Sequence, residues 1–455
     1  MTCNDCGCVG HNLQRKAHIP CAKKRTIEKL HNLLDESVDE VNAQLIEWRR
    51  HIHKHPELPN REKNTAKLIA DHLTALGLDE VRTHIAGYGV VGVLHGNQPG
   101  SRVIALRADI DALPVKEISD VDFISTFIDE DYPGGPFPVS HACGHDCHTA
   151  MLMAAASVLA KHRDQLPGTV LFVFQPAEEG APLDEEGGAL AMEKAGALSS
   201  PEPGMVFGMH VGPLPKGVVA YHIGNQYAAS VVVKIVITGQ QVHGSTPWLG
   251  KDPMPVVAEI ISASSQLYRQ VPAYNPVAIS FGHIEDVGRF NIIGEHVTMM
   301  GTIRCSVESD MEKICAKLKS MAEHIALSQG CTAEVEFLQP VPALYNSEQW
   351  VQAALPTLED VVGANHLIQI PPTLGYDDIS VFIQRHGGLY VTLGVQDTTF
   401  NGNNLVAAEA GRGLWYNHSP RFYADDETLS TGVRLHVHIA ADYLFGQLNV
   451  DNSTF

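Results

Sequence analysis

TAMLMAAASVLAKHRDQLPGTVLFVFQ, residues 149–175, is the stretch that most strongly predicts the fold. Its first part, residues 149–162, is rich in Ala, Leu and Met, and this composition favours an α-helix. After Pro-Gly, residues 169–175 form a short apolar run rich in Val and Phe, which is typical of a strand. A helix followed by an apolar strand indicates an α/β layer in which helices cover a largely parallel sheet.

The same alternation of helices and strands continues on both sides of this stretch. Apolar side chains three to four residues apart predict an amphipathic helix over residues 27–45. Gly77 is a suitable stop for a second helix. This second helix covers residues 64–76. The layer is also expected to contain strands at 102–107, 205–209 and 388–394 and a terminal helix at 428–445.

The pattern changes near Ala229, where apolar side chains begin to alternate as they do in a half-buried strand. The order expected from there is strand, helix, strand, strand, helix, strand, which is that of a ferredoxin-like unit. After the first strand, these elements are a helix at residues 252–270, strands at 277–284 and 296–304, a helix at 309–329 and a strand at 332–338. We therefore predict an inserted α+β domain at 229–339 and a catalytic α/β domain formed by 26–228 and 340–455.

Composition limits the class of partner and the compartment. The 455 residues are enough for two or three domains, and 32 Lys and Arg against 52 Asp and Glu give a formal charge of −20. This acidic excess argues against a nucleic acid or an anionic membrane as a partner. No apolar run approaches the length of a membrane span. Nine cysteines without a disulfide pattern, and an N-terminus without an apolar leader, predict a reduced, cytoplasmic protein.

Residues 1–25 are polar and rich in cysteine, with Cys3, Cys6, Cys8 and Cys21. We interpret this segment as a flexible tail. A zinc site is the alternative, because thiolate and imidazole ligands are both present, although their spacing matches no strong pattern.

The densest group of chemically active side chains is HACGHDCHT, residues 141–149, at the start of a predicted helix. Cys143 and His145 are two residues apart, so one loop can direct both to a single cation. A thiolate and an imidazole together suit Zn²⁺ and other borderline divalent metals. The alternative is a polar helix cap whose histidines have no function.

Other candidate residues are spread along the chain. Two adjacent carboxylates, Glu178 and Glu179, follow directly after the apolar strand, where α/β sheets carry their chemistry. One of them could bind a metal while the other transfers protons. His210, His243 and His418 follow strands or lie in loops, and each of them alone is more often structural than functional.

Taken together, these motifs resemble the aminoacylase and carboxypeptidase family of metal-dependent amidohydrolases. The resemblance is strongest to the branch of hippurate hydrolases and indole-acetyl-amino-acid hydrolases, and it covers roughly residues 42–446. The motifs that carry it, in the order of that branch, are HIHKHPE (51–57), RADIDALP (107–114), HACGHD (141–146), PAEEG (176–180) and GTIR (301–304).

The resemblance implies a metal centre. Cys143, His145, Glu179, His210 and His418 match the family's ligands, which hold two divalent cations in each subunit, Mn²⁺ or Zn²⁺.

The resemblance also implies roles around that centre. Glu178 matches the general base, and His243 matches a histidine that reaches into the active site of the partner subunit. Asn291 and Arg304 match positions that hold the free carboxylate of the substrate, and we expect Asp111 to orient a ligand. The inserted domain is implied to pair two chains as a homodimer, or as part of a dimer of dimers.

The predicted reaction is metal-dependent hydrolysis of the amide bond of N-acyl or N-aroyl amino acids or short peptides, which releases an amino acid and a carboxylic acid. A dipeptidase, a deacetylase of amino-acid precursors and a non-catalytic metal-binding homologue are the alternatives. Tyr376-Asp377-Asp378 stands where the branch has a Glu-Asp pair, and the segment 123–138 is longer than usual. Both departures concern the identity of the substrate and not the class of reaction.

Overall fold

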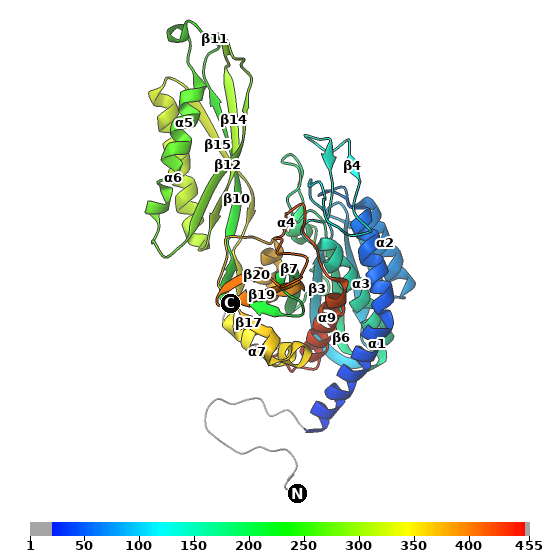
Figure 1. Ribbon diagram of the computed structural model, residues 1–455. Helices are drawn as coiled ribbons and strands as arrows, with labels where there is room; N and C mark the ends of the chain where they lie inside the picture. The colour runs from blue at the N-terminus through cyan, green and yellow to red at the C-terminus, as the bar shows by residue number, and fades with distance from the viewer. Residues whose placement is uncertain (1–20, 451–455) are drawn as a thin grey trace.

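The computed structural model describes residues 21–450, and it shows a smaller α+β unit that projects from a larger α/β unit (Figure 1). The larger unit is built on an eight-stranded sheet. Its strands, in spatial order, are β1 (Glu80–Ile85), β2 (Gly89–His95), β6 (Pro167–Gln175), β3 (Gln98–Asp109), β7 (Met205–Pro215), β18 (Gly388–Gln396), β8 (Val219–Tyr221) and β17 (Leu367–Gln369).

The centre of this sheet is parallel, as predicted. β3 pairs in parallel with β6 and β7, and β7 pairs in parallel with β18. β1 and β2 add antiparallel strands at one side, and β8 pairs antiparallel with β18 at the other. Because the four central strands run in one direction, the loops that follow them emerge at the same edge of the sheet.

Helices cover both faces of the large sheet. Alternate residues of β2 show the two faces, because Val90 and Leu94 join one hydrophobic core while Val91 and Val93 join the other. The first core is covered by α1 (Cys21–Lys54), α2 (Lys63–Ala75), α3 (His145–Lys161), α7 (Glu348–Val362) and α9 (Leu429–Leu444). The second is covered by α4 (Gly188–Lys194) and α8 (Ile379–His386).

The first helix is longer than the sequence analysis expected. α1 begins at Cys21, so residues 21–25, which were assigned to the flexible tail, are helical. Ala22 and the basic residues that follow are good helix formers and extend the periodic stretch upstream. Residues 1–20, with three of the four cysteines considered for a zinc site, lie outside the described residues, and the fourth, Cys21, begins α1.

The projecting unit has the predicted order of elements. They are β10 (Ala229–Thr238), α5 (Pro253–Ser264), β12 (Val277–Asp286), β14 (His296–Cys305), α6 (Glu308–Ser328) and β15 (Thr332–Val341). The strands form an antiparallel sheet in the order β12-β14-β10-β15, with α5 and α6 packed on one face around a separate core (Figure 1). The strand order is that of a ferredoxin-like unit.

Short elements complete the two units. The short strands are β4 (Ile128–Asp129), β5 (Phe137–Pro138), β9 (Gly224–Tyr227), β11 (Val242–His243), β13 (Ile292–Ile293), β16 (Leu344–Asn346), β19 (Thr398–Asn401) and β20 (Asn404–Ala407). Single 3₁₀ turns are η1 (Arg163–Gln165), η2 (Pro247–Leu249), η3 (Leu267–Gln270), η4 (Ala364–His366) and η5 (Asp426–Thr428).

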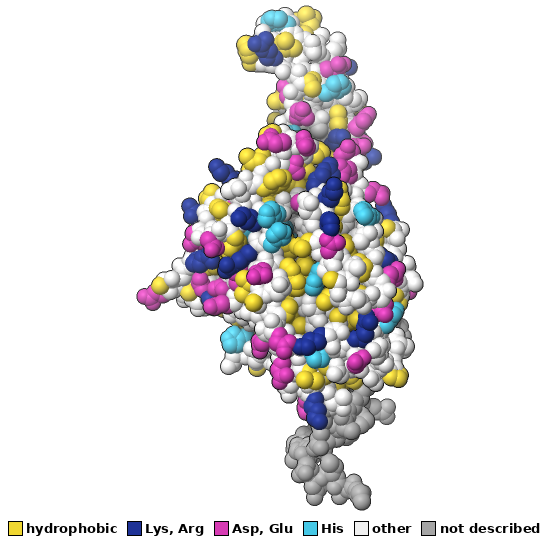
Figure 2. Space-filling model, turned by 90° about the vertical axis from the view of Figure 1, so that its right-hand side faces the viewer, with side chains coloured by type: hydrophobic (Ala, Val, Ile, Leu, Met, Phe, Trp, Pro, Cys, Tyr) yellow, Lys and Arg dark blue, Asp and Glu magenta, His cyan; other side chains and the backbone are white. Residues whose placement is uncertain are grey.

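The surface of the face drawn in Figure 2 carries acidic and basic side chains interspersed with apolar ones, and the smaller unit extends from it as a narrow projection. Across residues 21–450, no helix combines the length and the apolar character that a membrane crossing needs.

Candidate metal centre and active site

Six ligand-type side chains from four separate parts of the chain meet at the edge of the large sheet where its parallel strands end. They are Cys143, His145, Glu178, Glu179, His210 and His418. Their ligand atoms form overlapping groups, each within 4.8 Å: Cys143 with His145 and His210, Cys143 with Glu179 and His418, and His145 with Glu178 and Glu179. All five predicted metal ligands and the predicted base therefore lie in one cluster.

Gly144 allows the tight turn that presents two of these side chains. It has φ of +94°, and a Cβ atom there would lie 2.3 Å from Val211 Cγ2. Only glycine adopts this conformation readily and fits so close to a neighbouring strand. Asn417 fastens the same turn, because its Nδ2 donates to Cys143 O at 2.9 Å and to Val211 O at 3.1 Å.

Asp111 orients His145. The Nδ1–H of His145 donates to Asp111 O at 3.0 Å and to Asp111 Oδ1 at 3.1 Å. His145 Nε2 is buried without a hydrogen-bond partner among the described residues, 3.8 Å from Glu178 Oε2 and 4.0 Å from Glu179 Oε1. The other oxygen of Asp111 accepts the backbone N–H of Glu179 at 2.9 Å, so one carboxylate positions two of the predicted ligands.

His210 is oriented in a similar way. Its Nδ1 donates to Val211 O at 2.7 Å, which leaves Nε2 facing Cys143 Sγ at 3.3 Å. The strand β7 continues beyond the predicted strand end at residue 209, so His210 lies within the strand and not after it.

His148 also lies close, but its two ring nitrogens are already used. Nδ1 donates to Asp109 Oδ1 at 2.5 Å, and Nε2 accepts the backbone N–H of Val211 at 2.8 Å. A neutral imidazole with both nitrogens hydrogen-bonded has no lone pair left for a cation. His148 therefore has a structural role: it joins Asp109 to the backbone of Val211. It is not a metal ligand in this arrangement, although its ring nitrogens lie close to Asp109 and His145.

Burial and neighbouring charges separate the two adjacent glutamates. Burial, together with Asp377 and Glu179, raises the pKa of Glu178 well above its ordinary value. Burial also acts to raise the pKa of Glu179. The contact between His418 Nε2 and Glu179 Oε1, at 3.1 Å, outweighs burial, so the pKa of Glu179 is lowered from its ordinary value. Glu178 consequently holds a proton more readily than Glu179 does.

A buried network beneath Glu178 was not predicted. Arg107 lies among three carboxylates, at 2.7 Å from Asp109 Oδ2, 3.0 Å from Asp377 Oδ1 and 3.1 Å from Asp378 Oδ1. In the sequence, Arg107 and Asp109 are recognisable only as part of a motif, and Asp377 and Asp378 only as a departure from the family pattern. No local spacing links residue 107 to residues 377 and 378.

The positively charged side chain of Arg304, from β14 of the smaller unit, lies close to the cluster. Its guanidinium lies 4.4 Å from the ring centroid of Tyr376, and its Nη1 approaches Leu374 O at 3.5 Å. The hydroxyl of Tyr376 lies 3.5 Å from Glu178 O. Burial lowers the pKa of Arg304, and no carboxylate of the described residues forms an ion pair with it.

The structure does not bring His243 and Asn291 to this cluster. His243 lies in β11 at the far end of the smaller unit, and Asn291 is its neighbour there, since the backbone N–H of Gly244 donates to Asn291 O (Figure 1). Both side chains are exposed. Within one chain, the predicted site residues thus form two separate groups.

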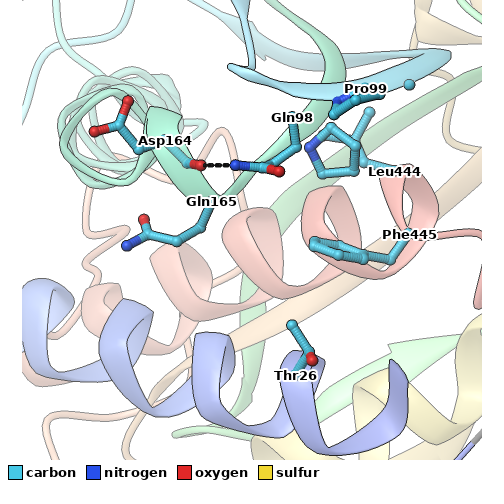
Figure 3. A pocket seen from close by; sticks show the side chains of 9 residues that line it. Thr26, Gln98, Pro99, Asp164, Gln165, Leu444 and Phe445 are labelled. Carbon is cyan, nitrogen blue, oxygen red and sulfur yellow. Dashed lines mark hydrogen bonds between the residues drawn. The ribbon is translucent and has the colours of Figure 1, made fainter. Parts of the chain in front are cut away.

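A cavity of about 480 Å³ lies away from the cluster, at the opposite end of β3 (Figure 3). The start of β3, the first turns of α1, the turn η1 and the C-terminal end of α9 line it, and Gln98 Nε2 donates to Asp164 O within this lining at 2.6 Å. It contains none of the six clustered residues.

Comparison with known proteins places the chain in a family. Residues 105–442 match peptidase family M20/M25/M40. The chain belongs to this family. It is accordingly a hydrolase, and the predicted resemblance to metal-dependent amidohydrolases is confirmed.

Two relatives illustrate the range of the family. Thermostable carboxypeptidase 2 of Saccharolobus solfataricus is 34% identical over 420 residues, which are 92% of this chain and 98% of the relative. IAA-amino acid hydrolase ILR1-like 2 of Arabidopsis thaliana is 30% identical over 411 residues, which are 89% of this chain and 86% of the relative.

A solved structure shows the same fold. The YXEP protein of Bacillus subtilis, described as a dinuclear metal binding peptidase of the M20 family, superposes with a TM-score of 0.68 at 28% identity. The match covers 89% of this chain and 99% of YXEP.

Proposed function

We propose that the chain hydrolyses the amide bond of N-acyl or N-aroyl amino acids, with two divalent cations per subunit, Mn²⁺ or Zn²⁺. The observation that carries the proposal is the convergence of five ligand-type side chains on one carboxylate that can act as a base. In this proposal the ligands are Cys143, His145, Glu179, His210 and His418.

The residues present fit such cations. His145 Nε2 is a buried ring nitrogen without a hydrogen-bond partner within residues 21–450, which is costly unless a cation occupies the position it faces. Both His145 and His210 donate from Nδ1, which leaves the lone pair on Nε2, and His210 Nε2 faces the Sγ of Cys143, another of the proposed ligands. When bound, divalent cations polarise the amide carbonyl and lower the pKa of water.

Glu178 is the carboxylate that the ligand set leaves free. It takes a proton from the attacking water and delivers it to the leaving nitrogen. The raised pKa of Glu178, caused by burial and by Asp377, makes its protonated form readily available for the second transfer.

Arg304 binds the carboxylate of the amino-acid part. It is a half-buried cation without an ionic partner among the described residues, and stacking on Tyr376 fixes its position. A guanidinium can form two parallel hydrogen bonds with a carboxylate, so the site favours substrates with a free C-terminal acid.

His243 and Asn291 serve the site of a second chain in a homodimer. The end of the smaller unit that carries them also exposes large apolar side chains, and such groups of exposed apolar residues mark protein interfaces. They are Trp248, Leu249, Val287 and Phe290, with 75%, 64%, 63% and 90% of their surfaces exposed.

Short peptides are a second class of substrate. The similarity to the carboxypeptidase of Saccharolobus solfataricus, at 34% identity, supports peptides as substrates. Release of a C-terminal amino acid from a peptide would use the same metal ligands and the same contact of Arg304 with the free carboxylate. A cytoplasmic location stays a prediction from the cysteine content.

A pair of conservative variants tests the roles of the adjacent glutamates. Glu178→Gln should retain both cations and lose nearly all turnover of an N-benzoyl amino acid, because it removes the base. Glu179→Gln should lower the metal content measured by elemental analysis. Loss of metal from Glu178→Gln but not from Glu179→Gln would show that the assignment is reversed.

A further inference from the structure

We propose that a cavity beside Glu179 binds the acyl group of the substrate and selects bulky apolar or aromatic acyl groups over small or anionic ones. The inference rests on the proposed amide hydrolysis. It concerns the half of the substrate that the metal cluster and Arg304 leave undefined.

The cavity has a volume of about 530 Å³ and borders the cluster, because Glu179 and the adjacent Gly180 are among its lining residues. This volume is in the range of small-molecule sites. The other lining residues are Leu58, Pro59, Leu113, Pro114, Tyr132, Pro133, Ala181, Pro182, Leu183 and Asp184. All but one of these are apolar or aromatic, so the wall suits hydrocarbon and aromatic groups.

The inner wall is fixed to the metal-binding loop. Leu58 is fully buried in a small apolar cluster with Ala112 and Val139. Leu113 exchanges two backbone hydrogen bonds with Ser140, at 3.0 and 3.1 Å, and Ser140 directly precedes the loop that carries Cys143. An acyl group in the cavity is therefore held against the same framework as the predicted ligands.

Polar contacts outside the cavity hold its outer wall. Arg61 donates to both carboxylate oxygens of Glu185, at 2.8 and 3.0 Å, and its guanidinium lies 5.4 Å from the ring centroid of Tyr132. Gln339 Nε2 donates to Ala181 O at 2.7 Å. The Arg61 contacts join the loop after Glu179 to the hairpin of β4 and β5, and the Gln339 contact joins it to β15 of the smaller unit, so the cavity is formed before a substrate enters.

Charge sets the orientation of the substrate and excludes an anionic acyl group. Asp184 is the carboxylate of the wall that the proposed metal ligands do not include, and the nearby cationic side chain, Arg61, is already paired with Glu185. Arg304, which forms no ion pair with any carboxylate that the structure describes, is not among the lining residues. The carboxylate end of the substrate therefore points to Arg304 and the acyl end to the cavity.

The unusually long segment 123–138 supplies part of this wall through Tyr132 and Pro133. The segment that departs from the family pattern in the sequence therefore lies where it can change the acyl preference.

Matched leucine variants test the proposal in the metal-loaded enzyme. Leu183 lines the cavity and is 43% exposed, whereas Leu190 lies in α4 outside it and is 39% exposed. The measured quantity is kcat/KM for an N-naphthoyl amino acid divided by that for the N-acetyl derivative of the same amino acid. Leu183→Ala should lower this ratio roughly tenfold, the effect of losing part of an apolar pocket. Leu190→Ala should leave the ratio unchanged.

The wild-type enzyme should also prefer the N-naphthoyl derivative to both the N-acetyl and the N-succinyl derivatives. A ratio for Leu183→Ala within twofold of that for Leu190→Ala, or a wild-type preference for N-acetyl or N-succinyl, would overturn the acyl assignment while amide hydrolysis stands.

A binding measurement separates the acyl assignment from the proposed function. Titration calorimetry of N-naphthoylglycine into Glu178→Gln enzyme should show tighter binding than N-acetylglycine, and adding Leu183→Ala should remove most of that difference. If the wild-type enzyme hydrolyses none of these amides, the proposed function fails. The calorimetry still tests the cavity in that case. Tighter binding of N-naphthoylglycine that depends on Leu183 would support the cavity as the acyl site, and the absence of this difference would refute it.

Discussion

Gly144→Ala is the substitution whose effect can be worked out most directly from the structure. Gly144 lies between Cys143 and His145 with φ of +94°, and an added Cβ would lie 2.3 Å from Val211 Cγ2. Two independent costs follow. A residue with a Cβ in left-handed backbone costs about 1–2 kcal/mol, and forcing a carbon into a filled site costs typically about 1–3 kcal/mol.

A second glycine isolates the backbone cost. Gly77 has φ of +67°, but an added Cβ there would meet nothing within 4 Å. Gly77→Ala should therefore lower the free energy of unfolding by only about 1–2 kcal/mol, whereas Gly144→Ala should lower it by about 2–5 kcal/mol. The Gly144→Ala change should also lower metal content, because it displaces the two ligands that flank it.

The assay is chemical denaturation of the wild type, the single variants Gly77→Ala, Gly144→Ala and Val211→Ala, and the double variant Gly144→Ala/Val211→Ala. Removing Cγ2 of Val211 should relieve the steric part, so a double-mutant cycle should show a favourable coupling of about 1–3 kcal/mol. Equal destabilisation by Gly77→Ala and Gly144→Ala, together with no coupling to Val211, would refute the reasoning.

Three further predictions follow from the site. Asp111→Ala should weaken metal binding by about 10–100-fold, measured by competition with a chelator, because both side-chain contacts to the ligands are lost and only the backbone contact to His145 remains. Arg107→Met should destabilise the fold by about 3–5 kcal/mol in denaturation experiments, because it leaves three carboxylates without their cation. Mixing inactive Glu178→Ala and His243→Ala subunits should restore roughly a quarter of wild-type activity if each site uses the partner's His243. No recovery despite proven subunit exchange would contradict a shared site.

Much of the fold could be predicted because its central elements have strong local signals. The apolar run of β6 and the periodic stretch of α1 are visible in the sequence, and so is the alternation in β10. β2 was missed although it lies beside β6, and its seven residues include two glycines that weaken a strand pattern. α7 was also missed, and it contains Pro356, which normally indicates a helix end.

The cluster itself was accessible from sequence only in part. Spacing alone indicates that Cys143 and His145 can share a cation, whereas Glu179, His210 and His418 were joined to them through the family resemblance. Nothing local shows that Asn417 fastens the turn of Cys143, since 274 positions separate them. Contacts of this kind depend on the order of strands in the sheet, which the sequence pattern does not specify.

The central claim is that the cluster is a two-cation centre for amide hydrolysis, and metal titration tests it most directly. The chelated protein should contain no divalent metal by elemental analysis and should not hydrolyse an N-benzoyl amino acid. Adding Mn²⁺ or Zn²⁺ should restore hydrolysis as the bound metal approaches two ions per chain. Full hydrolysis by verified metal-free protein would contradict the account.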